Sequence, residues 1–350
     1  MLREQGRQAV VSVLARQTLE SVAAAAGVSR ATASRVLTGS PRVSASAREK
    51  VLAAARELSY VPNAAARSLV TRRSDTVAFV VCEPEDKFFS DPFFSTVLKG
   101  AHRVVAESQL QLVFAVVSTD EDRLRLERYA SGGHLDGAMF VSLHGDEPMP
   151  SRLHALGVPV VLAGRPLDPS AAALPYVDVD NSGGATSATR RLLERGCARI
   201  ATITGPADMA GAMDRLEGWR SALFDAGRRP VEDDVAVGDY TIESGHSAML
   251  RLLEQAPDLD GVFVANDLMA AGALAALAES GRAVPTDVAV VGFDDIPLAS
   301  ATQPVLTTVR QPIELIGREM ARALVDAIAG RSQESVHVRL PTELVLRASA

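Results

Sequence analysis

The sequence predicts an α/β protein with a three-helix head at its N-terminus, a short hinge helix and then two lobes of doubly wound parallel sheet. Three observations predict this arrangement. Two short apolar-periodic runs surround a Gly-Val-Ser turn between Gln17 and Gly39. From residue 76 onward, β-branched runs alternate with helical patterns. The alternation occurs as two successive series in a chain of 350 residues, which is long for a single core.

The first two helices of the head form a helix-turn-helix. Val22 and Ala26 fall on one face of the first run, and Ala33 and Val36 fall on one face of the second. Gly27 supplies the positive φ that a tight turn between helices needs. Small alanines on both runs allow the two helices to cross closely.

The second helix presents a polar and basic face. Arginine can pair bidentately with guanine, and serine and threonine can reach phosphates, so this face suits the DNA major groove. The alternative is an ordinary helical hairpin with a solvated face. The candidate DNA-binding residues of this helix are Ser29, Arg30, Ala31, Thr32, Ser34 and Arg35.

A third helix and a hinge complete the head. Ser44 or Ser46 can cap the third helix, and Ser46 with Glu49 fits a capping box. Pro62 then ends one element, and the alanine-rich segment that follows favours a short helix that is marginal alone. An exposed leucine there can wedge into the minor groove, although an unstructured linker is the alternative. The candidate DNA-binding residues of this hinge are Asn63, Ala66 and Leu69.

Charge separates the head from the body. Residues 1–73 contain 12 Lys and Arg against 4 Asp and Glu, whereas the whole chain has a net charge of −7. A basic head on an acidic body is typical of a nucleic-acid-binding module joined to another domain. No apolar run spans a bilayer, no signal peptide is predicted, and two cysteines, Cys82 and Cys197, fit a reducing compartment. We therefore expect a cytoplasmic protein.

The body reads as two α/β series. Near-continuous apolar strands that alternate with helices indicate parallel sheets covered on both faces. Strands are expected at residues 77–81, 112–117, 137–141, 158–163, 200–204, 261–264 and 288–293, and helices at residues 92–108, 124–132, 185–195, 216–226, 243–255 and 268–281. Ligands of such sheets bind beyond the carboxyl ends of the strands, so the pocket is expected between the two lobes.

Polar and aromatic side chains follow several of these strands. Carboxylates, an amide, a guanidinium and an aromatic ring suit a polyhydroxylated ligand, because polar groups bond its hydroxyls and a ring stacks on its apolar face. The alternative for each acid is a helix N-cap. The residues at these positions are Asp91, Phe93, Arg215, Asp239, Tyr240, Asn266, Asp294 and Asp295.

The chain resembles the lactose-repressor family of bacterial transcription regulators. In the head, the resemblance rests on AGVSRATASRVL and VSASAREKVLAAARELSYVPNAAARSL. In the body it rests on DPFF, VDVDNSGG, RLEGW, VANDLMAAGAL, VAVVGFDD, LTTVRQP and LPTELVLR. The head departs from the family at Ser21, where an aspartate is usual, and the segment CEPEDKFFSDPFF is longer than the usual loop.

The resemblance implies a domain plan. Residues 1–16 are an extension, residues 17–61 the DNA-binding domain, residues 62–75 the hinge and linker, and residues 76–350 an effector domain similar to periplasmic binding proteins. Lobe N comprises residues 76–177 and 309–334, and lobe C comprises residues 178–308 and 335–347. The implied effector-binding residues are Arg215, Tyr240, Asn266, Asp294 and Gln311, with Asp91 and Phe93 on the N-terminal wall.

The resemblance also implies a function. The chain is expected to be a repressor that reads a pseudo-palindromic operator and responds to a small polar effector, a sugar. Arg30, Ala31 and Arg35 take the base-reading positions, and Leu69 is the minor-groove lever. The final residues, LVLRASA, lack a leucine-heptad tail, so we expect a homodimer rather than a tetramer.

Two other classes compete with this interpretation. A transport-type binding protein would carry a signal peptide and no basic helical head. An enzyme would need a catalytic constellation, whereas Asp294 and Asp295 are adjacent and point apart, and the six histidines lack metal-ligand spacing. The sequence predicts no catalytic residue, metal or cofactor.

Overall fold

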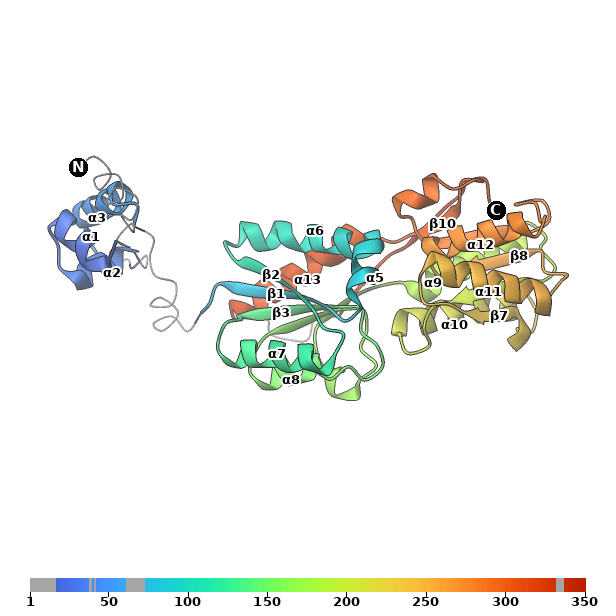
Figure 1. Ribbon diagram of the computed structural model, residues 1–350, viewed down its shortest axis with the longest axis horizontal. Helices are drawn as coiled ribbons and strands as arrows, with labels where there is room; N and C mark the ends of the chain where they lie inside the picture. Colours follow the sequence, from blue (N-terminus) through green and yellow to red (C-terminus); the bar gives the residue numbers. More distant parts are fainter. Residues whose placement is uncertain (1–16, 38–39, 41, 61–72, 332–336) are drawn as a thin grey trace, which may run out of the picture. The chain divides into compact units, whose positions relative to one another are not determined.

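The computed structural model describes residues 17–37, 40, 42–60, 73–331 and 337–350. The chain forms two compact units that divide between Ser74 and Asp75 (Figure 1). The expected extension at residues 1–16 lies outside the described residues. The same holds for the hinge residues Asn63, Ala66 and Leu69.

The first unit is a small bundle of three helices, α1 (Leu19–Ala26), α2 (Arg30–Leu37) and α3 (Ala45–Glu57). Its core is made of alanines and valines, which let the short helices pack closely. Gly27 has a φ of 64° and ends α1 in the left-handed conformation, as predicted. The buried core residues are Val22, Ala23, Ala26, Ala33, Val36, Val51, Ala54 and Ala55.

Hydroxyl side chains cap all three helices. Thr18 accepts from the backbone N–H of Ser21, and Ser21 Oγ accepts from the N–H of Thr18 at 2.9 Å. Ser21 therefore completes the cap at the position where the family usually has aspartate. Ser44 caps α3 by accepting from the N–H of Ala47, so the predicted capping box of Ser46 and Glu49 is wrong: both residues lie inside the helix.

The first lobe of the second unit is a parallel sheet of β1 (Thr76–Val81), β2 (Gln111–Val116), β3 (Gly137–Val141), β4 (Val160–Ala163), β5 (Tyr176–Val179) and β11 (His337–Leu340). The described strands lie in the order β11-β5-β4-β3-β1-β2. Helices α6 (Pro92–Glu107) and α13 (Ile313–Ile328) cover one face. Helices α7 (Asp120–Ser131) and α8 (Met149–Ala155) cover the other (Figure 1).

The second lobe repeats this plan. Its described strands lie in the order β12-β10-β9-β8-β6-β7, and only β12 is antiparallel among them. Helices α9 and α10 pack on one face and α11 and α12 on the other. The strands are β6 (Ile200–Thr204), β7 (Val235–Val237), β8 (Gly261–Val264), β9 (Ala289–Asp294), β10 (Thr307–Arg310) and β12 (Glu343–Val345). The helices are α9 (Asn181–Glu194), α10 (Ala210–Asp225), α11 (Ile242–Gln255) and α12 (Asp267–Glu279).

Within the described residues, the chain crosses between the lobes after β5, after β10 and after β11. The expectation that residues 335–347 belong to the second lobe is therefore wrong for the first part of that segment. β11 pairs in parallel with β5, with His337 opposite Tyr176 and Leu340 opposite Val179, and only β12 returns to the second sheet.

The predicted doubly wound architecture is confirmed, and its central strands are buried along their whole length. The long segment after β1 differs from expectation, because it folds a short helix, α5 (Glu85–Ser90), before α6 begins. Asp91 therefore follows α5 and not the first strand directly. This extra helix buries Phe88 in the core of the first lobe, and its Lys87 faces the space between the lobes.

Helices α6 and α13 touch through two glycines. A Cβ added at Gly317 would lie 1.9 Å from the carbonyl oxygen of Val97, and one at Gly100 would lie 2.0 Å from that of Glu314. Backbone oxygens cannot move aside as a flexible side chain can. The close approach of the two helices therefore requires the absence of a side chain at both positions.

We expect Gly317→Ala to destabilise the protein by roughly 1–3 kcal/mol, because the new methyl group forces the two helices apart. Urea unfolding followed by circular dichroism measures the change. Gly211→Ala is the matched control: its Cβ would meet its nearest atom at 3.6 Å, so the better helix propensity of alanine should leave stability unchanged or higher. Equal effects of the two substitutions would contradict the packing argument.

Candidate functional site

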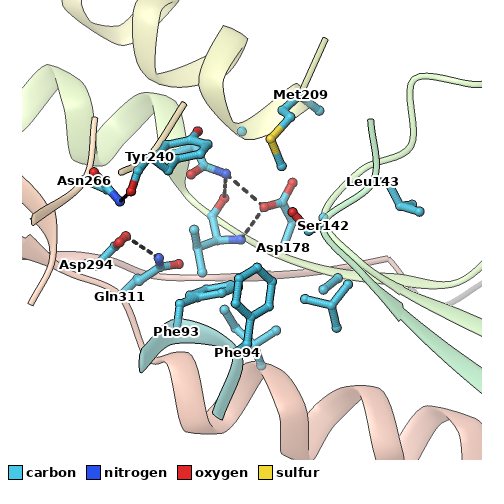
Figure 2. A pocket seen from close by; sticks show the side chains of 18 of the residues that line it. Phe93, Phe94, Ser142, Leu143, Asp178, Met209, Tyr240, Asn266, Asp294 and Gln311 are labelled. Atoms are coloured by element: carbon cyan, nitrogen blue, oxygen red, sulfur yellow. Dashed lines mark hydrogen bonds between the residues drawn. The ribbon is translucent and has the colours of Figure 1, made fainter. Parts of the chain in front are cut away.

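A pocket lies between the two lobes, at the carboxyl ends of the strands, where the fold predicts it. Figure 2 shows side chains from both lobes pointing into it. The structure brings together all seven residues that the sequence assigned to effector binding. These are Asp91, Phe93, Arg215, Tyr240, Asn266, Asp294 and Gln311.

The guanidinium of Arg215 is buried and lines this pocket. Its Nε donates to Oδ1 of Asn181 at 2.9 Å, and its Nη1 donates to the carbonyl oxygen of Ala265 at 2.5 Å. Asp294 Oδ1 lies 3.6 Å from Nη1, and the Phe293 ring centroid lies 3.8 Å from the guanidinium carbon. These hydrogen bonds, the nearby carboxyl and the π face of Phe293 thus compensate the desolvation of the buried guanidinium.

Asp294 stands at the end of β9 with a φ of 111°, a conformation that side-chain-bearing residues rarely adopt. Its Oδ1 accepts from Nε2 of Gln311 at 2.6 Å (Figure 2). Burial raises the pKa of this carboxyl well above its usual value; Arg215 opposes the shift, and the nearby carboxyls of Asp267 and Asp91 add to it. Asp295 points the other way, toward Arg310 and Arg347, so the expectation that the two acids diverge is confirmed.

Asn266 and Tyr240 form the wall on the side of the second lobe. Asn266 Oδ1 caps α12 by accepting from the N–H of Met269 at 2.9 Å, and its Nδ2 donates to the carbonyl oxygen of Tyr240 at 3.1 Å (Figure 2). Burial raises the pKa of the Tyr240 phenol to about 12, so the hydroxyl keeps its proton and can donate to a ligand.

Asp91 and Phe93 come from the first lobe. Asp91 caps α6 by accepting from the N–H of Phe93 at 2.8 Å, and burial raises its pKa. The alternative interpretation of these strand-end residues as helix caps is therefore right for Asp91 and Asn266, which line the pocket as well. Phe93 presents a half-buried ring beside Phe94 (Figure 2).

Several pocket residues were not predicted. Asp178 accepts from Nδ2 of Asn181 at 2.9 Å and from the N–H of Val179 at 2.7 Å (Figure 2). Asp178 and Asn181 both belong to the VDVDNSGG motif, and that motif could have indicated them as pocket residues. Glu83, Lys87, Ser142 and Met209 also line the pocket. They follow strand ends or sit on the extra helix, and nothing in their local sequence distinguishes them.

The chemistry of the pocket suits a neutral, polyhydroxylated ligand. Carboxyls, amides and a guanidinium offer donors and acceptors, and the phenylalanine rings offer apolar faces. Across the described ranges, no group of three or more His, Cys, Asp or Glu side chains is placed to hold a metal ion. No helix in the described part of the chain is long and apolar enough to cross a membrane.

The candidate DNA-reading face is the surface of α2. Ser29, Arg30, Ala31 and Arg35 are exposed there. Ser29 Oγ caps the helix by accepting from the N–H of Thr32 at 3.1 Å. Arg30 Nε pairs with Oε1 of Glu20 at 2.6 Å in an exposed ion pair.

A helix-turn-helix head joined to a two-lobed receptor with a pocket between its lobes defines a ligand-responsive, DNA-binding transcriptional regulator. Residues 18–63 match the lacI family of bacterial regulatory proteins, and residues 189–350 match a periplasmic binding protein-like domain. The chain belongs to the lacI family.

Curated relatives match the chain over nearly its whole length. The HTH-type transcriptional regulator CelR of Thermobifida fusca is 50% identical over 95% of this chain and 98% of its own. The ribose operon repressor of Escherichia coli K12 is 34% identical over 95% of this chain and 99% of its own.

Solved structures agree. A CelR–cellobiose complex has a TM-score of 0.77 at 48% identity and covers 96% of this chain and 100% of its own. The lac repressor dimer bound to operator and the anti-inducer ONPF has a TM-score of 0.80 at 26% identity. It covers 95% of this chain and 98% of its own. These relatives are DNA-binding regulators, and the predicted family and fold are confirmed.

We expect Arg215→Met to destabilise the protein by about 3–5 kcal/mol, because it leaves the polar partners of a buried cation unsatisfied. Urea unfolding measures the change. Arg190→Met is the control, since Arg190 and Asp225 form an exposed pair at 3.0 Å that should contribute about 0–1 kcal/mol. If Arg215→Met lowered the free energy of unfolding no more than Arg190→Met, the buried hydrogen bonds of Arg215 would not stabilise the pocket.

Proposed function

We propose that this regulator is a repressor whose effector is a short β-linked glucose oligosaccharide, with cellobiose as the representative. The pocket chemistry supports a sugar. The identity of 50% to CelR, and the CelR–cellobiose complex among the similar structures, support this sugar class. The observation that carries the proposal is that seven residues assigned from the sequence line one pocket between the lobes.

Each pocket residue has a proposed role. Arg215, Asn266 and Asp294 bond the hydroxyls of the sugar, and Gln311 orients Asp294 through its hydrogen bond of 2.6 Å. The phenolic hydroxyl of Tyr240 donates a hydrogen bond to the sugar. Asp91, on the opposite wall of the pocket, accepts a hydrogen bond from a sugar hydroxyl. Phe93 stacks on the apolar face of a sugar ring. The hydrogen bonds then fix the orientation of the sugar, and the ring of Phe93 supplies apolar contact.

DNA recognition is proposed for the head. Two heads of a homodimer read a pseudo-palindromic operator, since the symmetry of the protein mirrors that of the site. Arg30 and Arg35 contact base edges with Ala31 between them, and Ser29, Thr32 and Ser34 reach phosphates or bases. Asn63, Ala66 and Leu69 of the hinge contact the minor groove. The boundaries proposed are residues 17–61 for the DNA-binding domain and 62–75 for the hinge.

The sugar is proposed to be bound and released without chemical change. Each of the four acids of the pocket is engaged by the protein: Asp91 caps α6, and Asp294 accepts from Gln311. Asp178 accepts from Asn181, and Glu83 accepts from Lys87. None of these arrangements is that of an acid and a base on either side of a glycosidic bond. Incubating the protein with cellobiose and finding glucose would contradict this part of the proposal.

Isothermal titration calorimetry of the full-length protein tests the proposed effector. Cellobiose should bind and should raise the melting temperature by mass action, whereas maltose and ribose, as controls, should bind more weakly. If ribose bound and cellobiose did not, the family assignment would stand and the effector class would be wrong.

We expect Phe93→Ala to weaken cellobiose binding by about tenfold to a hundredfold, because loss of an aromatic contact costs roughly 1.5–3 kcal/mol. Phe89→Ala is the matched control: Phe89 is 78% exposed and does not line the pocket. Calorimetric titration of both variants measures the difference. If the two variants bound cellobiose equally well, Phe93 would not be a stacking platform.

We expect Arg35→Ala to weaken operator binding by about 1–3 kcal/mol and to relax base choice at one position, if it makes a bidentate contact to a base. Fluorescence anisotropy with operator variants measures both quantities. Arg56→Ala in α3 is the control for loss of an exposed positive charge. An equal loss of affinity for all sequences would identify Arg35 as a phosphate contact.

A further inference from the structure

One side chain outside the pocket joins the two lobes. His144 lies after β3 in the first lobe, and Asp208 lies after β6 in the second. Nδ1 of His144 is 3.1 Å from each carboxylate oxygen of Asp208, and its Nε2 is 3.0 Å from Oε1 of Glu83 in the first lobe. The N–H of Gly145 also donates to the carbonyl oxygen of Asp208 at 2.7 Å. The side-chain bridge thus stands beside a backbone bridge between the same two loops.

The charge of the imidazole decides whether both side-chain bonds form. A carboxylate can only accept, so each ring nitrogen must carry a proton to bond its partner. Only the imidazolium carries protons on both. The hydrogen bond to Glu83 is the main cause that raises the pKa of His144; partial burial opposes the shift, and Asp208 adds to it.

Glu83 connects this bridge to the pocket. Its side chain is buried and accepts from Nζ of Lys87 at 2.8 Å and from Oγ of Ser142 at 2.7 Å. All three residues line the pocket, whereas His144 and Asp208 do not. Nζ of Lys87 also lies 5.9 Å from the ring centroid of Tyr240 in the second lobe. Burial opposes ionisation of Glu83, but the bonds from His144, Lys87 and Ser142 hold its pKa below the usual value.

The other charged groups around His144 come from neighbouring loops and from α7. The hollow beside the ring is lined by Glu83, Arg123, Asp146, Glu147 and Asp208, and Lys87 stands behind Glu83. Arg123 stays charged at all relevant pH values and is paired with Glu147 at 2.6 Å. Histidine is the side chain whose ordinary pKa places its change of charge between pH 5 and 8.

We propose that His144 is a positioning residue of the effector pocket, which as an imidazolium holds the two lobes together through Glu83 and Asp208. This inference rests on the proposed function and deepens it, because it makes the affinity for the sugar depend on a group that the sugar does not touch. The closed form binds the proton more tightly than a form with the lobes apart. Closure is therefore favoured at low pH and is lost as the pH rises through the raised pKa of His144.

Calorimetry with cellobiose between pH 5.5 and 8.5 tests the effect on affinity. In the wild-type protein, the Kd should rise by about threefold to tenfold from pH 6 to pH 8, since a difference of one pKa unit between the two forms is equivalent to a factor of ten. Binding near neutral pH should take up protons, which titrations in buffers of different ionisation enthalpy detect.

Three variants assign the effect to this bridge. His144→Gln and Asp208→Asn should bind cellobiose weakly across the whole range, with no proton uptake near neutral pH. His246→Gln should keep the wild-type profile, because His246 pairs with Glu279 within the second lobe at 2.8 Å. A His144→Gln protein with the wild-type pH profile would overturn the proposal.

A measurement without sugar separates this proposal from the choice of effector. Spin labels at Glu121→Cys in the first lobe and Glu232→Cys in the second report the distance between the lobes by pulsed electron resonance, in full-length protein diluted with unlabelled chains. The distance should increase from pH 6 to pH 8, and in His144→Gln it should be long at both. A distance that does not change with pH overturns the bridge, whereas a distance that changes in a protein that does not bind cellobiose overturns only the effector.

Discussion

The architecture of the pocket depends on one buried cation, the guanidinium of Arg215. Its compensating partners stand where the chain passes from strand to helix: Asn181 at the start of α9, Ala265 after β8, and Asp294 at the end of β9. Asp294 is bonded in turn to Gln311, beside the crossing from β10 to α13. A ligand that bonds to this set therefore contacts residues at two of the crossings between the lobes.

Within each lobe, the helices pack at very short distances. Helices α6 and α13 meet at glycines in the first lobe, and α11 and α12 meet closely at Gly272 in the second, where a Cβ would lie 2.0 Å from the carbonyl oxygen of Ile242. Such tight contacts resist sliding, because a packed interface has no room for intermediate positions. We therefore expect ligand binding to act on the crossings and on polar contacts between the lobes, such as that of His144 and Asp208.

Much of the fold and of the pocket was predictable from the sequence, because buried parallel strands produce continuous apolar runs and their carboxyl ends gather at one edge of the sheet. That rule brought Asn266 and Asp294 to one pocket, and the family resemblance added Gln311. The cap of α3 was not predictable, since Ser44 and Ser46 offer the same hydroxyl and only backbone geometry separates them. β11 belongs to the first lobe because it pairs with β5, a strand some 160 residues earlier in the chain, and a local sequence pattern does not reveal that pairing. Glu83 and His144 come from loops and Lys87 from the short helix α5, and no local pattern encodes the three-dimensional neighbours of these residues.

A repressor that responds to a sugar requires one coupling free energy between the pocket and the DNA-reading head. Fluorescence anisotropy of labelled operator, with and without saturating cellobiose, measures it most directly, together with calorimetry of cellobiose with and without operator. We expect the two affinities to change by the same factor, equivalent to ~1–3 kcal/mol, because coupling is reciprocal. An operator affinity that stays the same while cellobiose is bound would show that the two sites are not coupled.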